Sequence, residues 1–311
     1  MSKINNIIVI GSLNMDLVAS TPRIPEIGET ILGTKLDEIP GGKGANQAVS
    51  ARQAGGKTWM FGKIGRDSYG KYLKENLTKF DIDLEFLIED EDEDTGTAVI
   101  SVDEKGNNSI IVIPGANSKL SAGDIEKKQD NLNKFDMMLL QLEIPEETVL
   151  KAVDTAAENN IMVVLDPAPV FKLPESIYKK VDIITPNTTE AEQLTGIKVE
   201  DEESMNKAAD YFLKRGVKIV ILTLGSKGLF VKTKKESFTV PGLKVNAVDT
   251  TAAGDCFTGT FAAVYDGSNL KEAVEWANTG AAISTTKMGA QTSIPDKEEI
   301  KKFLENIKED K

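Results

Sequence analysis

Short apolar runs without polar alternation recur along this chain of 311 residues, and they constrain the fold more than any other feature. A strand that is buried on both faces of a sheet has such a continuous apolar sequence. Segments with the apolar spacing of amphipathic helices separate several of the runs. The predicted strands are residues 7–10, 137–142, 162–166, 183–185 and 219–223, and the predicted helices are residues 146–159, 202–215 and 269–288. Alternating strands and helices predict a parallel sheet flanked by helices.

Two stretches depart from this alternation and predict a second, smaller sheet. Residues 15–20 with 30–38, and residues 97–102 with 108–113, have the pattern of paired antiparallel strands. These four strands are expected to form a lid outside the main sheet, within about residues 14–40 and 96–114. No linker divides the chain, so residues 1–311 are expected to form one domain.

The composition excludes several classes of function. The 49 acidic residues exceed the 37 basic ones, giving a formal charge of −12, so neither nucleic acid nor an anionic membrane is an expected partner. Histidine is absent, which leaves acid–base chemistry to Asp, Glu, Lys or Tyr. The single cysteine, Cys256, allows no intrachain disulfide. No targeting or membrane segment is recognisable, so a soluble cytoplasmic protein is expected.

The segment from Asp249 to Phe257 contains the clearest functional motif. Small residues lead into one carboxylate, Asp255, and an apolar helical run follows. The free backbone N–H groups of a helix N-terminus attract anions, and the small side chains of residues 252–254 let a phosphate approach closely. Asp255 would then accept a proton from a hydroxyl beside that phosphate, which indicates phosphoryl transfer to an alcohol. The alternative is that Asp255 serves only as an N-cap.

A glycine-rich segment, residues 40–48, opens a helix that is expected to run to about Ala54. Its spacing matches neither GxxxxGK[ST] nor GxGxxG, so it predicts no nucleotide-binding loop of either kind. Lys43 and Asn46 lie about one turn apart and suit a polyhydroxylated ligand. The alternative is a glycine-rich helix entry with an exposed lysine.

Further polar residues follow predicted strands, where ligands bind in open α/β sheets. Asn14 and Asp16 alternate onto one side of the chain after the first strand, and Glu143 follows the strand at 137–142. Each alone has the alternative interpretation of a solvated loop residue.

Asn187 and Glu190 lie three residues apart at a helix start, where they would organise Mg²⁺ and nucleotide phosphates through water. Glu190 alternatively completes a capping box. The loop 223–228 follows a strand and permits a tight approach to a ligand, or forms a hairpin turn.

Together these segments resemble the ribokinase (pfkB-type) family of sugar kinases, nearly from end to end and in the same order. Residues 41–46 resemble the first signature of the family, and residues 249–255 resemble the second. Residues 11–16, 166–169, 186–190 and 289–291 are also similar to the family. The resemblance implies a doubly wound, mainly parallel sheet with a small β lid, and homodimers that join their lids. It implies ATP-dependent phosphorylation of D-ribose at O5.

The resemblance also implies the roles of individual residues. Asp255 would be the general base and would contact the sugar, and Ala252, Ala253 and Gly254 would form the anion hole. Glu190 would support Mg²⁺. The implied D-ribose ligands are Asn14, Asp16, Gly42, Lys43, Asn46 and Glu143. The implied ATP contacts are Asn187, Thr223, Leu224, Gly225, Ser226, Lys227, Gly228, Gly254 and Asn278. The implied monovalent cation site, usually for K⁺, consists of Asp249, Thr251, Ser284, Lys287, Gly289 and Ser293.

The chain departs from the family pattern at three positions: Thr251, Cys256 and the adenine-side Asn278. Two other functions stay open. One is phosphorylation of another sugar or of a nucleoside, as by deoxyribokinases and adenosine or pseudouridine kinases. The other is non-catalytic sugar binding on the same scaffold.

Overall fold

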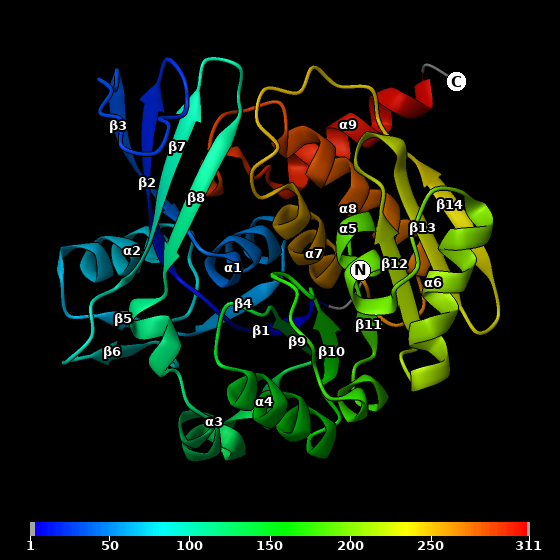
Figure 1. Ribbon diagram of the computed structural model, residues 1–311. Coiled ribbons are helices and arrows are strands. Elements are labelled where there is room, and N and C mark those ends of the chain that lie inside the picture. Colours follow the sequence, from blue (N-terminus) through cyan, green and yellow to red (C-terminus); the bar gives the residue numbers. More distant parts are fainter. Residues whose placement is uncertain (1–3, 310–311) are drawn as a thin grey trace.

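A mainly parallel sheet runs through the computed structural model, which describes residues 4–309 (Figure 1). Within these residues, six adjacent strands of the sheet are parallel to one another, and two further strands continue it as an antiparallel edge. In spatial order the strands are β14 (Ser237–Pro241), β13 (Gly228–Thr233), β12 (Ile219–Thr223), β11 (Ile183–Ile184), β10 (Met162–Leu165), β9 (Met137–Leu140), β1 (Asn6–Ile10) and β4 (Lys57–Phe61). All five predicted strands are confirmed.

Helices cover both faces of the main sheet, as a doubly wound fold requires. Alternate residues of β1 enter opposite cores: Ile8 and Ile10 pack on one face, Ile7 and Val9 on the other. On the first face lie α3 (Ala122–Lys128), α4 (Glu146–Glu158), α5 (Thr188–Thr195) and α6 (Glu202–Arg215). On the second lie α1 (Lys43–Gln53), α2 (Ser68–Lys79), α7 (Ala253–Val264) and α8 (Leu270–Ser284), and α9 (Lys297–Glu309) packs beside α8. None of the helices in residues 4–309 has the length and hydropathy to cross a bilayer.

The predicted lid is a separate four-stranded sheet (Figure 1). Its strand order is β3 (Lys35–Gly41), β2 (Asn14–Thr21), β7 (Gly96–Asp103) and β8 (Asn108–Ile113). The pairs β2–β3 and β7–β8 are antiparallel, as expected, and β2 pairs with β7 in parallel. The four side chains Ile110 to Ile113 are all half or more exposed, so the edge strand β8 has uncovered apolar side chains on both faces of the lid in the single chain.

Two predicted boundaries are wrong, and each has a local cause. The strand expected over residues 30–38 begins only at Lys35, because β2 ends at Thr21 and its pairing with β3 ends at the Ser20–Lys35 pair. The helix expected over residues 269–288 ends at Ser284. The hydroxyl groups of Ser284, Thr285 and Thr286 donate to the carbonyls three residues back and so compete with further helical bonds.

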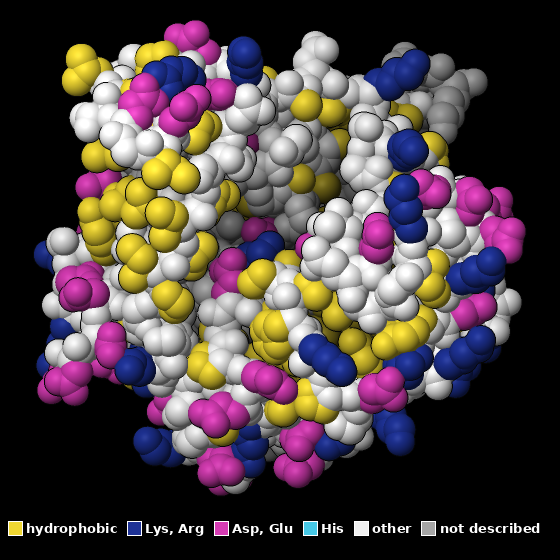
Figure 2. Space-filling model, viewed as in Figure 1, with side chains coloured by type: hydrophobic (Ala, Val, Ile, Leu, Met, Phe, Trp, Pro, Cys, Tyr) yellow, Lys and Arg dark blue, Asp and Glu magenta, His cyan; other side chains and the backbone are white. Residues whose placement is uncertain are grey.

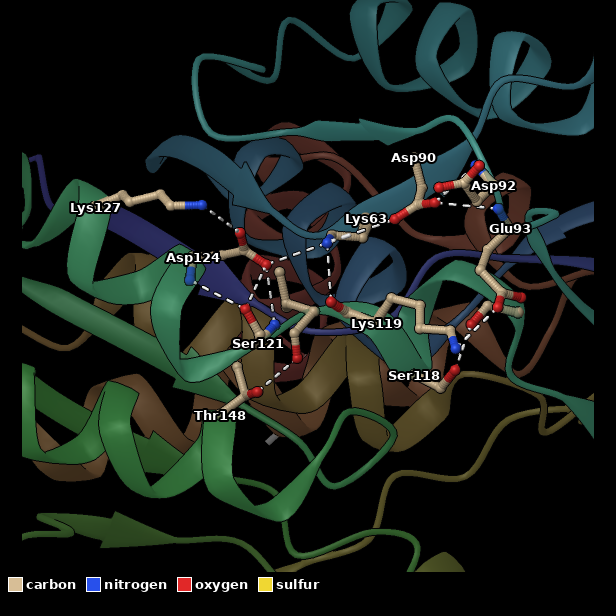
Figure 3. A network of polar contacts seen from close by, with 12 residues as sticks. Lys63, Asp90, Asp92, Glu93, Ser118, Lys119, Ser121, Asp124, Lys127 and Thr148 are labelled. Carbon is tan, nitrogen blue, oxygen red and sulfur yellow. Dashed lines mark hydrogen bonds and ion pairs between the residues drawn. The ribbon is translucent and has the colours of Figure 1, made fainter.

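A buried lysine fixes the base of the β7–β8 hairpin (Figure 3). Lys63, on the short strand β5 (Lys63–Gly65), is 8% exposed and donates to the carbonyl of Lys119 at 2.8 Å. Its ammonium group also lies 3.1 Å from Asp124 and 3.6 Å from Asp90. Asp90 ends β6 (Ile88–Asp90), which leads to β7, and Lys119 ends the η1 turn (Gly115–Lys119), which follows β8. The lysine therefore ties both ends of the hairpin to the body of the molecule.

Candidate active site

Glycines at the start of α1 let two backbone segments meet. Gly42 has φ of 87°, and a Cβ there would lie 2.7 Å from the backbone nitrogen of Asn14. A Cβ at Gly44 would lie 2.6 Å from the backbone of Gly11 and Ser12. The first consequence of these glycines is therefore that the start of α1 packs against the loop after β1.

Asp255 lies where α1 crosses α7. Asn46 Nδ2 donates to Asp255 Oδ2 at 3.0 Å, and Gln47 Nε2 donates to Asp255 Oδ1 at 3.1 Å. The crossing is close because residue 259 is glycine: a Cβ there would lie 2.5 Å from the carbonyl oxygen of Gln47. Asp255 is 5% exposed. Its carboxylate is therefore held from one side by two amides, and lone pairs remain for a ligand.

The alternative interpretation of Asp255 as an N-cap is wrong. The cap residue of α7 is Ala252, with φ of 59°, and no side chain in the described part of the chain caps this helix. Asp255 lies in the first turn. The backbone N–H of Ala253 is engaged by the carbonyl of Thr250 at 3.3 Å, so it is the most constrained of the predicted anion-hole donors. An uncapped helix start leaves donors for an anion.

The predicted sugar residues come together beside Asp255. Ser12 Oγ donates to Glu143 Oε2 at 2.5 Å, and the backbone N–H of Lys43 donates to the same oxygen at 3.2 Å. A Cβ at Gly41 would lie 2.2 Å from Asp16 Oδ2, so this carboxylate lies directly over the glycine. Burial raises the pKa of Asp16 to about 7, with smaller contributions from the negative charges of Glu143 and Asp255. The three carboxylates therefore form one electrostatic cluster.

Lys43 supplies positive charge among these carboxylates. Burial alone would lower the pKa of its ammonium group, but the charges of Asp255, Asp166, Glu143 and Glu190 raise it above the usual lysine value. Lys43 lines a cavity together with Asp255. The alternative of an exposed lysine at a helix entry is therefore wrong.

Two adjoining cavities lie beside this cluster, in the hollow that Figure 2 shows between the lid and the body of the molecule. The smaller, of about 210 Å³, is lined by Lys43, Asp166, Glu190 and Asp255 among others. The larger, of about 390 Å³, is lined mainly by small and apolar residues. The walls that both cavities share are Asn187, Thr223, Thr250, Ala253 and Gly254. The start of α7 thus lies at the junction of the two cavities.

Asn187 and Glu190 form a capping box at the start of α5, as the alternative interpretation held. Asn187 Oδ1 accepts from the N–H of Glu190 at 2.9 Å, and Glu190 Oε2 accepts from the N–H of Asn187 at 2.8 Å. Both residues also line the smaller cavity. Burial is the main cause of a raised pKa at Glu190, against which the charge of Lys43 and the N–H of Asn187 act. Capping and a ligand role are therefore compatible at this position.

The loop after β12 is both the turn of a β12–β13 hairpin and a wall of the larger cavity. Thr223, Gly225, Ser226 and Gly228 line that cavity. Leu224 instead packs against the hydrophobic core, and Lys227 is exposed and lines neither cavity. Asn278 lines the larger cavity and donates to the carbonyl of Pro241 at 3.0 Å, so its amide fixes the loop that follows β14.

The structure unites part of the expected cation site. Asp249 accepts from the N–H and hydroxyl of Thr251 at 2.9 and 2.6 Å, and from the N–H of Gly289 at 2.9 Å. Burial acts against ionisation, but these bonds lower the pKa of Asp249 overall. The side chain of Lys287 points elsewhere and pairs with Glu299 on α9. No group of three or more His, Cys, Asp or Glu side chains within residues 4–309 is arranged to hold a metal ion.

Sequence reasoning missed three kinds of site residue. Gln47 lies inside the segment 40–48, but the interpretation of that segment as a sugar site did not include it. Asp166 ends the predicted strand 162–166 and was not predicted as a site residue, although Glu143, which follows the strand at 137–142, was. Asn117 was missed as well: it donates to Asn14 Oδ1 at 2.8 Å and so fixes the orientation of that amide. The residues Leu243, Val245, Ala247, Ala281 and Ala282 line the larger cavity without any motif that marks them.

Known proteins resemble this chain over almost its whole length. A profile of pfkB family carbohydrate kinases matches residues 4–297. The chain is 43% identical over 299 residues to a ribokinase of Haemophilus influenzae, covering 96% of this chain and 98% of that protein. It is 36% identical over 301 residues to a deoxyribokinase of Salmonella typhi, covering 96% and 98%. A structure of Arabidopsis thaliana ribokinase complexed with ribose and ATP matches with a TM-score of 0.91 at 31% identity, covering 97% of this chain and 99% of that one.

Proposed function

This chain belongs to the pfkB family of carbohydrate kinases, and we propose that it transfers the γ-phosphoryl group of ATP to O5 of D-ribose, giving D-ribose 5-phosphate and ADP. The observation that carries the proposal is the position of Asp255. Its carboxylate adjoins the sugar-side cluster and lies in the first turn of a helix whose uncapped start forms the wall between two cavities. The similar proteins named ribokinase, one of them complexed with ribose and ATP, support both substrates.

Asp255 acts as the general base on the 5-hydroxyl of the sugar. A loose phosphoryl-transfer transition state lets the proton leave late, so a carboxylate suffices even though an alcohol is a far weaker acid. Asn46 and Gln47 hold the carboxylate from behind, so that its remaining lone pairs face the cavity. The implied sugar ligands are Asn14, Asp16, Gly42, Lys43, Asn46 and Glu143. Orientation and charge neutralisation then supply most of the acceleration.

ATP occupies the larger cavity, with its phosphates at the shared wall. The backbone of Ala252 to Gly254 faces the transferring phosphoryl group, and Thr223, Gly225, Ser226, Gly228 and Asn278 contact the nucleotide. Asn187 and Glu190 hold Mg²⁺ through water, and a carboxylate whose pKa is raised by burial suits a nearby cation. When bound, Mg²⁺ neutralises charge on the phosphates.

A panel of acceptors tests this function. ADP release is measured with ATP and Mg²⁺ on D-ribose, 2-deoxy-D-ribose, other pentoses, adenosine and pseudouridine. The proposal requires the highest kcat/KM with D-ribose. A preference for 2-deoxy-D-ribose or for a nucleoside would assign the corresponding kinase activity instead, and sugar binding without ADP release would indicate a non-catalytic protein.

K⁺ binds at the loop that Asp249 organises. The carboxylate of Asp249 and the buried hydroxyls of Ser284 and Ser293, each of which keeps a free lone pair, are oxygen ligands of the kind a hard cation takes. Thr251, Lys287 and Gly289 supply the remaining oxygens through their backbones. The ion stabilises the loop that leads into α7. K⁺ is therefore expected to raise kcat over Na⁺ at matched ionic strength, and Asp249→Ala is expected to abolish that difference. Equal kcat in K⁺ and in Na⁺ would contradict the proposed K⁺ site.

The lid is also the proposed dimer interface. Ile110 to Ile113 make β8 an exposed apolar edge strand, and apolar side chains are seen in yellow over β7 and β8 in Figure 2. Ile111 and Ile113 lie on one face of the lid, and Ile110 and Val112 lie on the other. Covering the face that carries Ile111 and Ile113 with the same face of a second chain would remove these side chains from water. Sedimentation of the wild-type protein and of Ile111→Glu distinguishes the two states, because only the wild type is expected to dimerise.

A further inference from the structure

A buried glutamine on α1 connects two buried carboxylates at the site. Gln47 has no exposed surface. Its Nε2 atom donates to Asp255 Oδ1 at 3.1 Å and to Asp166 Oδ2 at 2.9 Å. Asp166 comes from the carboxyl end of β10, and Asp255 from the first turn of α7. One NH₂ group therefore supplies donors to two acidic groups from different elements.

A second glutamine fixes the orientation of the first. Gln141, which follows β9 and is fully buried, donates from Nε2 to Gln47 Oε1 at 2.6 Å. Rotating the Gln47 amide by half a turn would place its oxygen against two carboxylates and its NH₂ group against another NH₂ group. Because acceptors facing acceptors repel, only one orientation of Gln47 is compatible with its neighbours.

Burying the side-chain amides of Gln47 and Gln141 is unfavourable for the stability of the fold. Gln141 Oε1 is buried without a hydrogen-bond partner among the described residues. It also lies 2.0 Å from where a Cβ at position 11 would be, so this position requires Gly11. A leucine or methionine would fill the space without burying an unpartnered oxygen. The polar pair is therefore costly to the fold and is better explained by what it does to the carboxylates.

We propose that Gln47, oriented by Gln141, is the positioning residue that keeps the Asp255 carboxylate aimed at the substrate hydroxyl. This inference rests on the proposed role of Asp255 as general base. Asn46 and Gln47 each hold one oxygen of this carboxylate, so losing the Gln47 donor leaves Oδ1 without its fixed partner. The other charged groups that act on the two carboxylates, Asp166 and Asp255, are Lys43, Asp16, Glu143 and Glu190. Lys43 is the only cation among them, so the Gln47 amide supplies donors where negative charge is in excess.

Gln47→Leu is the first test, because leucine fills the space and donates no hydrogen bond. We expect kcat to fall roughly 10- to 100-fold, as for the loss of a group that orients an active-site ligand. KM for D-ribose is expected to change little, because Asn46 and the sugar ligands stay in place.

Ser50→Ala is the matched control. Ser50 is buried on the same helix and contacts α7 through the carbonyl of Cys256 at 2.7 Å, but it contacts no carboxylate. It reports any loss that comes only from disturbing the contact between α1 and α7. A kcat loss in Ser50→Ala equal to that in Gln47→Leu, with KM for D-ribose equally unchanged, would overturn the positioning role. If Gln47→Leu does not fold, Gln141→Leu leaves Gln47 in place and is expected to show a smaller loss of kcat, again with little change in KM for D-ribose. An unchanged kcat there would overturn the proposal.

A double-variant cycle separates this inference from the proposed function. If Gln47 acts through Asp255, then Gln47→Leu causes no further loss in the Asp255→Asn background. Losses that multiply instead would refute the positioning role and leave Asp255 as the base. Wild-type turnover in Asp255→Asn alone would refute the role of Asp255 as base, and with it this inference. The cycle distinguishes this outcome from multiplied losses, which would refute only the role of Gln47.

Discussion

The proposed sugar end of the site is lined by charged side chains, whereas the proposed nucleotide end is lined mainly by glycines, alanines and other apolar residues. At the sugar end, Asp16, Glu143 and Asp255 form one electrostatic cluster around Lys43. At the nucleotide end, Leu243, Val245 and Ala247 line the larger cavity beside the start of α7. Fixed charges discriminate among hydroxyl patterns because a missing partner leaves a buried polar group unpaired. An apolar wall contributes contact area with less discrimination. Changes at the sugar end are therefore expected to cost more than changes at the nucleotide end.

The largest effect is expected for Asp255→Asn. This change keeps the size of the side chain but removes the base, so kcat is expected to fall roughly 10²–10⁴-fold. KM for D-ribose is expected to change little. Steady-state kinetics measure both constants, and an unchanged melting temperature serves as the control for folding. Turnover close to that of the wild type would exclude Asp255 from the proton transfer.

The next effect concerns the substrate itself. If Asp16 accepts hydrogen bonds from the 2- and 3-hydroxyls of ribose, removing the 2-hydroxyl leaves the acceptor poorly paired, at a cost of about 1–3 kcal/mol. D-ribose is then expected to exceed 2-deoxy-D-ribose in kcat/KM by roughly tenfold or more. Asp16→Asn is expected to narrow this preference. Equal kcat/KM values for the two sugars in the wild type would contradict the role given to Asp16.

Asp16 also gives the sugar end a pH dependence. With a pKa of about 7 in the free protein, its carboxyl is partly protonated at neutral pH. Hydrogen bonds from sugar hydroxyls favour the charged form, so ribose binding near pH 7 is expected to release protons. Calorimetric titration in two buffers of different ionisation enthalpy measures this release. The release is expected to be reduced in Asp16→Asn, and an undiminished release there would assign it to another group.

Two glycines on α7 have different expected roles: Gly254 in phosphate binding and Gly259 in helix packing. A Cβ at Gly254 would meet nothing within 4 Å, so Gly254→Ala is expected to fold normally and to raise KM for ATP several-fold by crowding the phosphates. A Cβ at Gly259 would lie 2.5 Å from Ser50 Cβ, so Gly259→Ala is expected to destabilise the protein by about 1–3 kcal/mol. Thermal unfolding and ATP kinetics of both variants provide the measurement. A destabilised Gly254→Ala with normal kinetics would contradict the assignment of the α7 start to the phosphate.

The smallest effect is expected at Asn278. Its amide already bonds to the carbonyl of Pro241, so it contributes to the nucleotide end mainly by fixing a loop. Asn278→Ala is expected to raise KM for ATP roughly two- to fivefold, the value of one neutral hydrogen bond, and to leave kcat unchanged. A loss of kcat/KM for ATP as large as the loss of kcat/KM on replacing D-ribose with 2-deoxy-D-ribose would contradict the expected difference between the two ends.

The contrast between charged and apolar walls also explains how much of the fold and of the site the sequence alone predicts. The apolar runs predict the central strands because burial on both faces demands them, and the two antiparallel pairs predict the lid. The start of β3 and the end of α8 depend on a partner strand and on three hydroxyl groups, which a local pattern does not reveal. At the sugar end the function resides in side chains, so motifs mark most of it. At the nucleotide end the walls are mostly backbone and small apolar side chains, and residues 243–247 carry no recognisable signal.

The thiol of Cys256, next to Asp255, is a probe of how often α1 and α7 separate. Cys256 is the only cysteine in the chain and is fully buried, and burial raises its pKa to about 12. Both the barrier to access and the small thiolate fraction protect it from alkylation in the closed structure. Labelling therefore requires transient opening of this region, and its rate reports how often the helix that carries Asp255 separates from its neighbours. A bound sugar that joins α1 to α7 through Asn46 and Asp255 would slow the alkylation of a residue that it never touches.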